Sequence, residues 1–503
     1  MTRQAQARAH VAGVLLAAVG VGALLRLWAL GRQGLWYDEA VTAWLLGGTP
    51  GQMLHAVPIT ESTPPLFYAL AWGWVRVLGT TEAGLRSLSA VAGIATVPVA
   101  FAAARSLIGL RAGLVAAVLV AVNPFLIWYS QEARAYSLLA LLSATGLWLF
   151  ARARERPGPG RLAAWGTVSA LALATHYFAI FAIAPEALML LLDRRARARW
   201  RLLAVGIVGA AGVALLGIAA RQTGEHVLYF THTSLAHRVN QIAHQYLVGF
   251  RPPATQPLFL VAAAAVVVAA VLLVWRTEPD ERRGAAAVAA VLAGAVAIPI
   301  LLALAGRDFL NTRNVIAGVV PAMVLLAAGL GARRAGLTGL AAAAVLVAVS
   351  LTTMGLVARS PWAQRGRWRE VAHALRPAAA GPPQAVLVRG SGSWARTLSH
   401  YLPRTWWMKP SGARVAEIDV LRRLPDGHGC HGASWWGAIC DFRPEPGLAR
   451  PPAPGFRLAA TERVQGFAID RWRAPRPVRF RPPPPRPYFR YLVAPTHVPG
   501  LPR

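Results

Sequence analysis

Acidic residues are scarce in this chain of 503 residues, which has 21 aspartates and glutamates against 52 lysines and arginines. Lysine is also nearly absent, because Lys409 is the only one, so the net charge of +31 comes from arginine. The arginines cluster between apolar segments and in the C-terminal part, and they do not line one amphipathic face. Because basic loops are typical of the cytoplasmic side of membrane proteins, this distribution argues against nucleic-acid binding and favours contacts with membrane lipids.

Cysteine is the second residue in short supply. Cys430 and Cys440 are the only two, and both lie in the C-terminal third. If this third is exported, the two thiols could form one disulfide, because such bonds persist in oxidising compartments. The alternative is that they are two unrelated thiols.

Long apolar runs, by contrast, dominate the chain, which is 55% hydrophobic with a mean hydropathy of +0.44. A soluble domain is rarely this apolar, and many runs reach the roughly 17–25 residues that a helix needs to cross about 30 Å of hydrocarbon. The sequence therefore predicts a polytopic α-helical membrane protein with about 11 spans. These are residues 11–30, 87–107, 112–128, 136–151, 162–175, 177–192, 201–220, 257–275, 285–305, 312–331 and 336–357.

The charge distribution orients these predicted spans. No clear small-residue cleavage site follows the run 11–30, so we expect a retained helix with its N-terminus inside rather than a signal peptide. The Arg-rich loops then alternate in register with the spans and are expected to be cytoplasmic. The segment 64–79 is apolar but short, and a full crossing there would invert every later loop. It is therefore predicted to be a juxtamembrane or re-entrant helix.

Composition divides the chain into three parts. Residues 1–358 are predicted to form the membrane domain. Residues 359–473 have short apolar runs typical of a small α/β domain, which the odd number of spans places outside the cytoplasmic membrane. Residues 474–503 are rich in proline and arginine, cannot bury a core, and are expected to be disordered or polyproline-like.

Polar and ionisable residues gather on the expected outer face, although such groups are costly near hydrocarbon and are therefore candidates for function. Carboxylates there can accept a proton from a hydroxyl, and arginines can bind a phosphate with paired, charge-assisted hydrogen bonds. The combination favours transfer of a group from a lipid phosphate to an acceptor. The set comprises Asp38, Glu39, Glu61, Arg86, Glu132, Arg134, His176, Tyr177, Arg307, Asp308, Arg313 and Asn314.

Metal-ligand spacing is not found on this face, which has no HxxxH pattern and no cysteine cluster, so no protein metal site is predicted. The acids could still hold a divalent cation together with a phosphate, and no other cofactor is indicated.

Six segments resemble the polyprenyl-phosphate-dependent glycosyltransferases of the GT-C fold, the superfamily of the protein O-mannosyltransferases and aminoarabinose transferases. In order, they are LWYDEAVTAW, TPPLFYAL, GLRSLSAVAG, NPFLIWYSQEARAYSLLALL, THYFAIF and RNVIAGVVPAMVLLAAGL. The resemblance covers roughly residues 25–335, and the C-terminal α/β domain fits it loosely. The proline pair is often preceded by histidine in such proteins, whereas Thr63 stands here, so a role that depends on this histidine is not carried over.

The resemblance implies an inverting transfer of a hexosyl or pentosyl group from a polyprenyl-phosphate donor to an acceptor hydroxyl. The reaction would occur on the outer face of the cytoplasmic membrane, for cell-envelope glycan or for protein or lipid glycosylation. Asp38 would be the general base or would orient the acceptor, and Glu61 would orient the acceptor or neighbouring groups. Arg86, Arg134 and Arg313 would bind the donor phosphate.

The remaining candidates also have structural readings. Glu39 next to Asp38 supports a loop more readily than it reaches the same site, because adjacent side chains on a helix diverge. Glu132 could pair with Arg134, and His176, with its neighbour Tyr177, contacts the substrate or is a hydrogen-bonded packing residue. The arginines could instead be interfacial residues that extend their charges to water, and Asp38 could be a helix cap.

Two other classes of function compete with the enzyme. A transporter or lipid flippase would place ionisable groups inside its spans and often contains an inverted repeat, and neither pattern is visible. A non-catalytic protein that binds the cell envelope through its C-terminal domain would not require acids and arginines on one face.

Overall fold

The computed structural model describes residues 3–222, 233–250, 254–360, 363–375, 384–389, 392–402, 412–424, 447–464, 466–481 and 489–491. The chain forms two compact units. The first unit combines Met1–Leu30 with Leu54–Ala363, and the second combines Gly31–Met53 with Gln364–Arg503. Cys430 and Cys440 lie outside the described residues, so their pairing stays a prediction.

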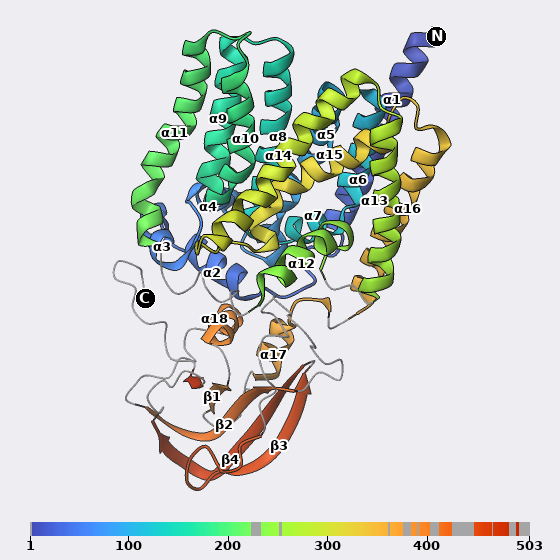
Figure 1. Ribbon diagram of the computed structural model, residues 1–503. Helices are drawn as coiled ribbons and strands as arrows, with labels where there is room; N and C mark the ends of the chain where they lie inside the picture. Colours follow the sequence, from blue (N-terminus) through green and yellow to red (C-terminus); the bar gives the residue numbers. More distant parts are fainter. Residues whose placement is uncertain are drawn as a thin grey trace. The chain divides into compact units, whose positions relative to one another are not determined.

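The first unit is helical, and Figure 1 shows its long helices, with α8, α9 and α11 packed beside one another. Its helices are α1 (Arg3–Leu27), the end of α3 (Pro50–Thr60), α4 (Leu66–Leu78), α5 (Glu82–Leu107), α6 (Leu110–Val122), α7 (Pro124–Ser130), α8 (Tyr136–Glu155), α9 (Pro159–Thr175), η1 (Tyr177–Ala179), α10 (Ile180–Leu192), α11 (Ala198–Arg221), α12 (Leu235–Val248), α13 (Thr255–Trp275), α14 (Pro279–Leu304), η3 (Thr312–Gly318), α15 (Val319–Leu330) and α16 (Gly336–Arg359).

Among the described residues, eight helices are long and apolar enough to cross a membrane. A ninth span results if α6 and α7, which are bent by 56° at their junction, form one broken span. The prediction of a polytopic helical membrane protein is confirmed, but the number of 11 spans is not. The predicted spans 162–175 and 177–192 are only 17 and 13 helical residues long as α9 and α10, because His176 has an extended backbone and ends α9. The helix expected at 64–79 is α4, with 13 residues.

Close helix packing depends on small residues, as in other membrane bundles, because small side chains let two backbones approach each other. A Cβ atom at Gly284 of α14 would overlap the carbonyl of Leu107 at the end of α5. A Cβ atom at Gly329 of α15 would overlap the carbonyl of Ala269 in α13. Glycine at these two positions therefore sets the distance between the paired helices.

The second unit contains a five-stranded sheet with strand order β3-β4-β2-β1-β5. The pairing of β1 with β2 is parallel, and the other pairings are antiparallel. The unit also includes the helices α2, α17 and α18. The bounds are α2 (Tyr37–Leu46), α17 (Trp368–Leu375), β1 (Gln384–Arg389), α18 (Gly392–Tyr401), β2 (Ala413–Arg423), β3 (Arg457–Val464), β4 (Phe467–Phe480) and β5 (Phe489–Tyr491).

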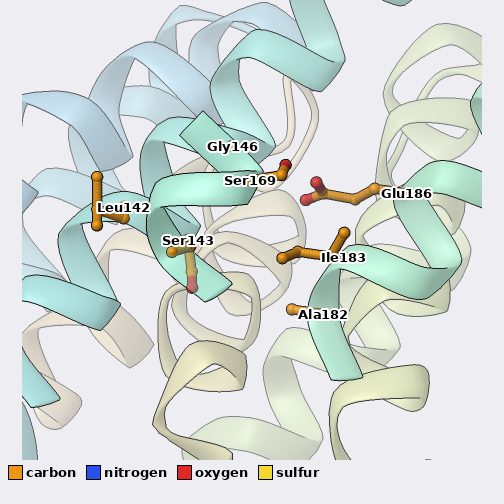
Figure 2. A pocket seen from close by; sticks show the side chains of 8 residues that line it. Leu142, Ser143, Gly146, Ser169, Ala182, Ile183 and Glu186 are labelled. Atoms are coloured by element: carbon orange, nitrogen blue, oxygen red, sulfur yellow. The ribbon is translucent and has the colours of Figure 1, made fainter. Parts of the chain in front are cut away.

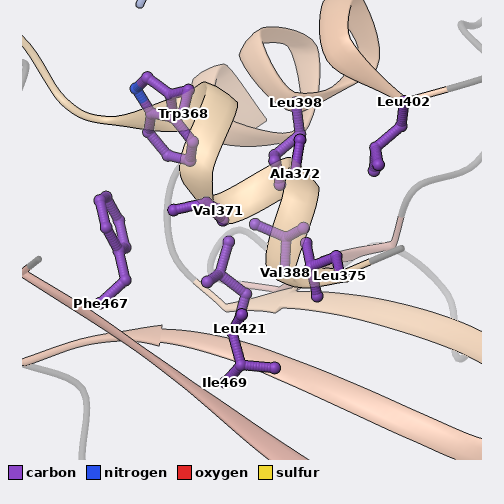
Figure 3. Close-up of a cluster of buried hydrophobic side chains, with 10 residues drawn as sticks. All are labelled: Trp368, Val371, Ala372, Leu375, Val388, Leu398, Leu402, Leu421, Phe467 and Ile469. Carbon is purple, nitrogen blue, oxygen red and sulfur yellow. The ribbon is translucent and has the colours of Figure 1, made fainter. Parts of the chain in front are cut away.

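The core of the second unit lies between the sheet and its helices. Figure 3 shows Val371 and Leu375 of α17 directed toward Val388, Leu421 and the neighbouring apolar side chains of the sheet. The predicted small α/β domain is thus confirmed as a sheet packed with helices. Its bounds differ from the prediction, because β4 continues to Phe480 and includes residues 474–480, which the composition assigned to the tail. Prolines are tolerated at the end of a strand when their missing N–H is not needed for pairing.

Candidate functional site

A buried ion pair joins two loops of the first unit. Glu61 follows α3, and Arg134 lies between α7 and α8. The Nη1 atom of Arg134 donates to Oε2 of Glu61 at 2.8 Å, and the two side chains are only 6% and 3% exposed. The hydroxyl of Ser89 in α5 donates to the carbonyl of Arg134 at 3.2 Å and holds its backbone. The structure thus brings these two predicted site residues into direct contact.

Aromatic side chains connect this pair with two more predicted site residues. The guanidinium of Arg134 lies 6.0 Å from the ring of Tyr68, and that of Arg313 lies 5.8 Å from the ring of Tyr136. The rings of Tyr136 and His176 are 5.7 Å apart. We call this set the Arg134 cluster: Glu61, Tyr68, Arg134, Tyr136, His176 and Arg313. It contains two guanidinium groups and one carboxylate, a balance that suits an anionic ligand.

Tyr177 reaches the loop of Glu61 through a residue that the sequence did not indicate. Its hydroxyl donates to Oε1 of Gln222 at 2.7 Å. Nε2 of Gln222 in turn donates to the carbonyls of Val57 and Thr63 at 3.3 and 3.0 Å, on either side of Glu61. Tyr177 and Gln222 therefore fix the loop that presents Glu61. The only sequence signal for Gln222 is its place directly after a long apolar run, and its burial is seen only in the structure.

Arg86 and Glu132 are buried in the same unit, with 1% and 2% exposure. Nη1 of Arg86 donates to the carbonyl of Leu30 at 3.0 Å, near the end of α1. The carbonyl of Glu132 accepts from the N–H of Arg134 at 2.8 Å and tightens the turn between α7 and α8. These contacts stabilise the end of α1 and the turn before α8.

The segment 307–314, which the sequence also placed on the outer face, has an ion pair of its own. The carboxylate of Asp308 accepts from Nη1 and Nη2 of Arg238 at 2.8 and 2.5 Å. These hydrogen bonds hold the pKa of Asp308 below its usual value. Arg238, which sequence reasoning missed, also donates to the carbonyl of Leu310 at 2.8 Å and thereby connects α12 with the start of η3.

Asp38 and Glu39 begin α2, which belongs to the second unit. Glu39 is fully buried, its Oε2 accepts from the N–H of Trp36 at 3.3 Å, and the same oxygen lies 3.9 Å from Nε of Arg365. Glu39 thus stabilises the first turn of the helix. Asp38 is half-buried, and its carbonyl accepts from the hydroxyl of Thr42 at 3.0 Å. The neighbouring acids have different surroundings, as the helical geometry predicts.

A small cavity lies among α8, α9 and α10, and none of the predicted site residues lines it. Figure 2 shows the carboxylate of Glu186 directed toward Ser169, with Ser143 and Gly146 nearby. Oε2 of Glu186 accepts from Nε1 of Trp165 at 2.8 Å. The free space, about 10 Å³, is at the lower limit for one water molecule and cannot admit a sugar.

Within the described ranges, no three histidine, cysteine, aspartate or glutamate side chains are grouped so that they could hold a metal ion. The Arg134 cluster instead offers cationic groups, whose natural ligand is an anion such as a phosphate.

One sequence-family model matches part of the chain. Residues 62–220 match the family described as dolichyl-phosphate-mannose-protein mannosyltransferase. No curated protein matches the chain. The matched range contains Arg86, Glu132, Arg134, His176 and Tyr177 but not Asp38, Glu39, Glu61 or Arg313.

Several solved structures resemble large parts of the chain. ArnT from Cupriavidus metallidurans bound to undecaprenyl phosphate is 14% identical, with a TM-score of 0.55 over 91% of this chain and 98% of that one. The same enzyme in the apo state is 17% identical, with a TM-score of 0.49 over 72% and 70%. The oligosaccharyltransferase AglB from Archaeoglobus fulgidus, in complex with an inhibitory peptide and a dolichol-phosphate, is 14% identical, with a TM-score of 0.47 over 82% and 69%.

The likeness to ArnT extends over nearly the full length of both chains, and identity at this level establishes the fold. The resemblance found in the sequence motifs is thus confirmed by an independent comparison of three-dimensional structure. The protein is a polytopic membrane protein with the fold of the GT-C polyprenyl-phosphate-dependent glycosyltransferases.

Proposed function

We propose that this protein transfers a sugar from a polyprenyl-phosphate carrier to an acceptor hydroxyl. The observation that carries the proposal is the Arg134 cluster, in which Arg134 and Arg313 contact aromatic rings in a membrane domain. ArnT, which has the same fold, is described with bound undecaprenyl phosphate, and a carrier of this kind suits two guanidinium groups. The sugar could be a hexose or a pentose.

In the proposed reaction, Arg134 and Arg313 bind the donor phosphate. As the bond between the sugar carbon and the phosphate oxygen breaks, negative charge grows on that oxygen, and the guanidinium groups stabilise it. Polyprenyl phosphate is the leaving group. Glu61 accepts a hydrogen bond from Arg134 at 2.8 Å, so it would keep that guanidinium oriented. This role matches the prediction that Glu61 orients neighbouring groups.

Asp38 would complete the reaction as the general base. The acceptor oxygen forms the new bond to the sugar carbon in a single displacement, and its proton passes to the carboxylate of Asp38. The configuration at the sugar carbon is then inverted.

Arg86, Glu132, His176 and Tyr177 would support this site rather than react. Arg86 and Glu132 bond to backbone groups, the ring of His176 packs beside Tyr136, and the hydroxyl of Tyr177 donates to Gln222. The proposal does not require a divalent cation beside the phosphate, and the experiment below tests for one with a chelator. The alternation of Arg-rich loops with spans supports a site and a C-terminal unit on the outer side of the cytoplasmic membrane. The acceptor could belong to an envelope glycan, a protein or a lipid.

The test uses the purified full chain in lipid nanodiscs with sugar-labelled polyprenyl-phosphate donors, with and without a chelator. We expect the wild type to release polyprenyl phosphate and to label a hydroxyl acceptor. Asp38→Asn and Arg134→Gln should each lower the rate by roughly 10²- to 10⁴-fold, since they remove the base or a phosphate ligand. Arg152→Gln is the matched control, because Arg152 is exposed and pairs with Glu155 on the surface.

Two results would overturn the proposal. One is a wild type that releases no carrier phosphate from any donor but moves the intact lipid across a bilayer, which is the behaviour of a flippase. The other is a wild type that binds envelope glycans but transfers no sugar. Equal rates for the wild type and Asp38→Asn would remove Asp38 from the mechanism and leave the transfer itself intact.

A further inference from the structure

The ends of α6 and α1 each receive hydrogen bonds from a side chain of another segment. α6 ends at Val122, and α7 begins with Pro124 after a bend of 56°. Arg26, in the last turn of α1, is fully buried. Its Nη1 donates to the carbonyl of Ala121 at 2.7 Å and its Nη2 to that of Val120 at 3.0 Å. Arg26 therefore satisfies carbonyls that the break in the helix would leave without partners.

Gln131 closes the end of α1 in return. Its Nε2 lies within hydrogen-bonding distance of the carbonyls of Leu25 at 3.1 Å, Arg26 at 3.2 Å and Trp28 at 3.0 Å. Its own backbone N–H donates to the carbonyls of Ile127 and Trp128 and ends α7. One residue thus terminates two helices that are about a hundred positions apart in the sequence.

The physical reason for this exchange is the cost of unsatisfied carbonyls. The last four carbonyls of a helix have no partner within the helix, and burying one without a hydrogen bond costs free energy. Gly93 of α5 allows the close approach, because a Cβ atom there would overlap the hydroxyl of Ser130 and lie 2.9 Å from Nε of Arg26. The ends of α1, α6 and α7 are therefore fixed relative to one another.

This junction also sets the position of Arg134. Gln131 is the first residue of the loop 131–135 between α7 and α8, and Arg134 lies three positions later. The far side of the loop is held where Ser89 donates to the carbonyl of Arg134 at 3.2 Å. With both sides of so short a loop attached to other helices, the guanidinium of Arg134 has little freedom to move relative to Glu61.

We propose that Gln131 is a positioning residue for the transfer reaction, whose side-chain amide, by closing α1, holds the loop that presents Arg134. This inference rests on the proposed function. Gln131 would not touch the substrate, and its effect would pass through Arg134. A shift of about 1 Å in a group that binds the transferring phosphate can lower the rate by roughly 100-fold.

The test replaces Gln131 by glutamate, which has nearly the same shape but cannot donate a hydrogen bond when it is ionised. Gln131→Glu keeps the shape but removes the amide donor and places negative charge beside three carbonyls. Gln131 is half-buried, so the carbonyls that it releases can bind water, and the variant should fold. Gln6→Glu is the matched control, because it makes the same change at an exposed position of α1. The rates of carrier-phosphate release are measured for the wild type, Gln131→Glu, Arg134→Lys and the double variant.

We expect Gln131→Glu to lower kcat by roughly 10- to 100-fold, with a thermal midpoint within a few degrees of the wild type. The double variant should be no slower than Arg134→Lys alone, since both changes act on one group, whereas independent effects would multiply. A merely structural role would give independent effects or an unfolded protein.

The outcomes separate this inference from the proposed function. If the wild type releases carrier phosphate and Gln131→Glu is as fast, or the two effects multiply, the positioning role is wrong and the transferase proposal stands. If the wild type releases none, the proposed function is wrong and the positioning role is withdrawn with it.

Discussion

The ion pair between Glu61 and Arg134 makes the sharpest prediction about stability. Replacing Glu61 by alanine removes the carboxylate and leaves the guanidinium of Arg134 with 6% of its side chain exposed. Breaking a buried pair in this way typically costs about 3–5 kcal/mol, because the remaining charge stays buried after the loss of its counterion. Tyr68 cannot replace the carboxylate, since its ring lies 6.0 Å from the guanidinium and a cation–π contact of this kind contributes about 0.5–2 kcal/mol.

The structure also predicts how the loss of stability depends on the residue that replaces Glu61 and on whether Arg134 is replaced as well. Glu61→Gln keeps a side-chain carbonyl that can accept from Arg134, so it should lose less stability than Glu61→Ala. In the double variant Glu61→Gln with Arg134→Met neither charge of the pair remains, and its stability should lie closer to the wild type than that of Glu61→Ala. The coupling energy between positions 61 and 134 should therefore exceed about 1 kcal/mol.

The assay measures unfolding of the full chain in detergent. Unfolding is monitored through the accessibility of engineered thiols in the first unit as denaturant or temperature rises. Arg283→Gln is the control, because the pair of Arg283 with Asp280 is exposed on the surface and such pairs contribute little. A loss below about 1 kcal/mol for Glu61→Ala would refute the reasoning, as would additive losses in the double variant.

The remaining predictions concern two glycines and one buried acid. Gly93→Ala should sharply lower the yield of folded protein, because the added Cβ would overlap the hydroxyl of Ser130. Gly146→Ala should be tolerated, since its Cβ would be no closer than 3.7 Å to any neighbour. Expression levels and thermal midpoints of the two variants test this difference. Burial raises the pKa of Asp419 to about 7, although Arg471 lies 3.2 Å away. The folded state then keeps a proton that the unfolded state releases near pH 4, so the contribution of Asp419 to stability should fall as the pH rises from about 4 to about 7. Asp419→Asn should remove this pH dependence from the thermal midpoint of the second unit, and an unchanged profile would contradict it.

Local patterns predicted the elements well. Apolar runs identified the membrane helices, because a span must be apolar over its whole length to be stable in lipid. The short segments WREVAHAL, AVLVRG and GFAIDRW are α17, β1 and part of β4. The number of 11 spans is not confirmed, because hydropathy does not register where the backbone breaks, as at His176.

Within the candidate site, the predicted residues were only part of the arrangement. Acids and arginines in apolar surroundings are conspicuous in a sequence, and Glu61, Arg134, His176 and Arg313 were found in this way. Tyr68, Tyr136 and Gln222 were not, because an aromatic ring or an amide has no local signal that names its contact. Arg238, the partner of Asp308, was missed as well. Gln131 and Arg26 escaped for the same reason.

The sequence by itself determined that this is an Arg-rich membrane protein with a GT-C-like set of motifs, since composition, hydropathy and motif order are properties of the chain alone. The tertiary structure decided which charges meet. It paired Glu61 with Arg134, assigned Glu39 to a helix start in the second unit, and used Arg26 and Gln131 to close the ends of helices distant in sequence. The physical reason is that the cost of a buried charge or carbonyl depends on its partner, and only packing brings partners together.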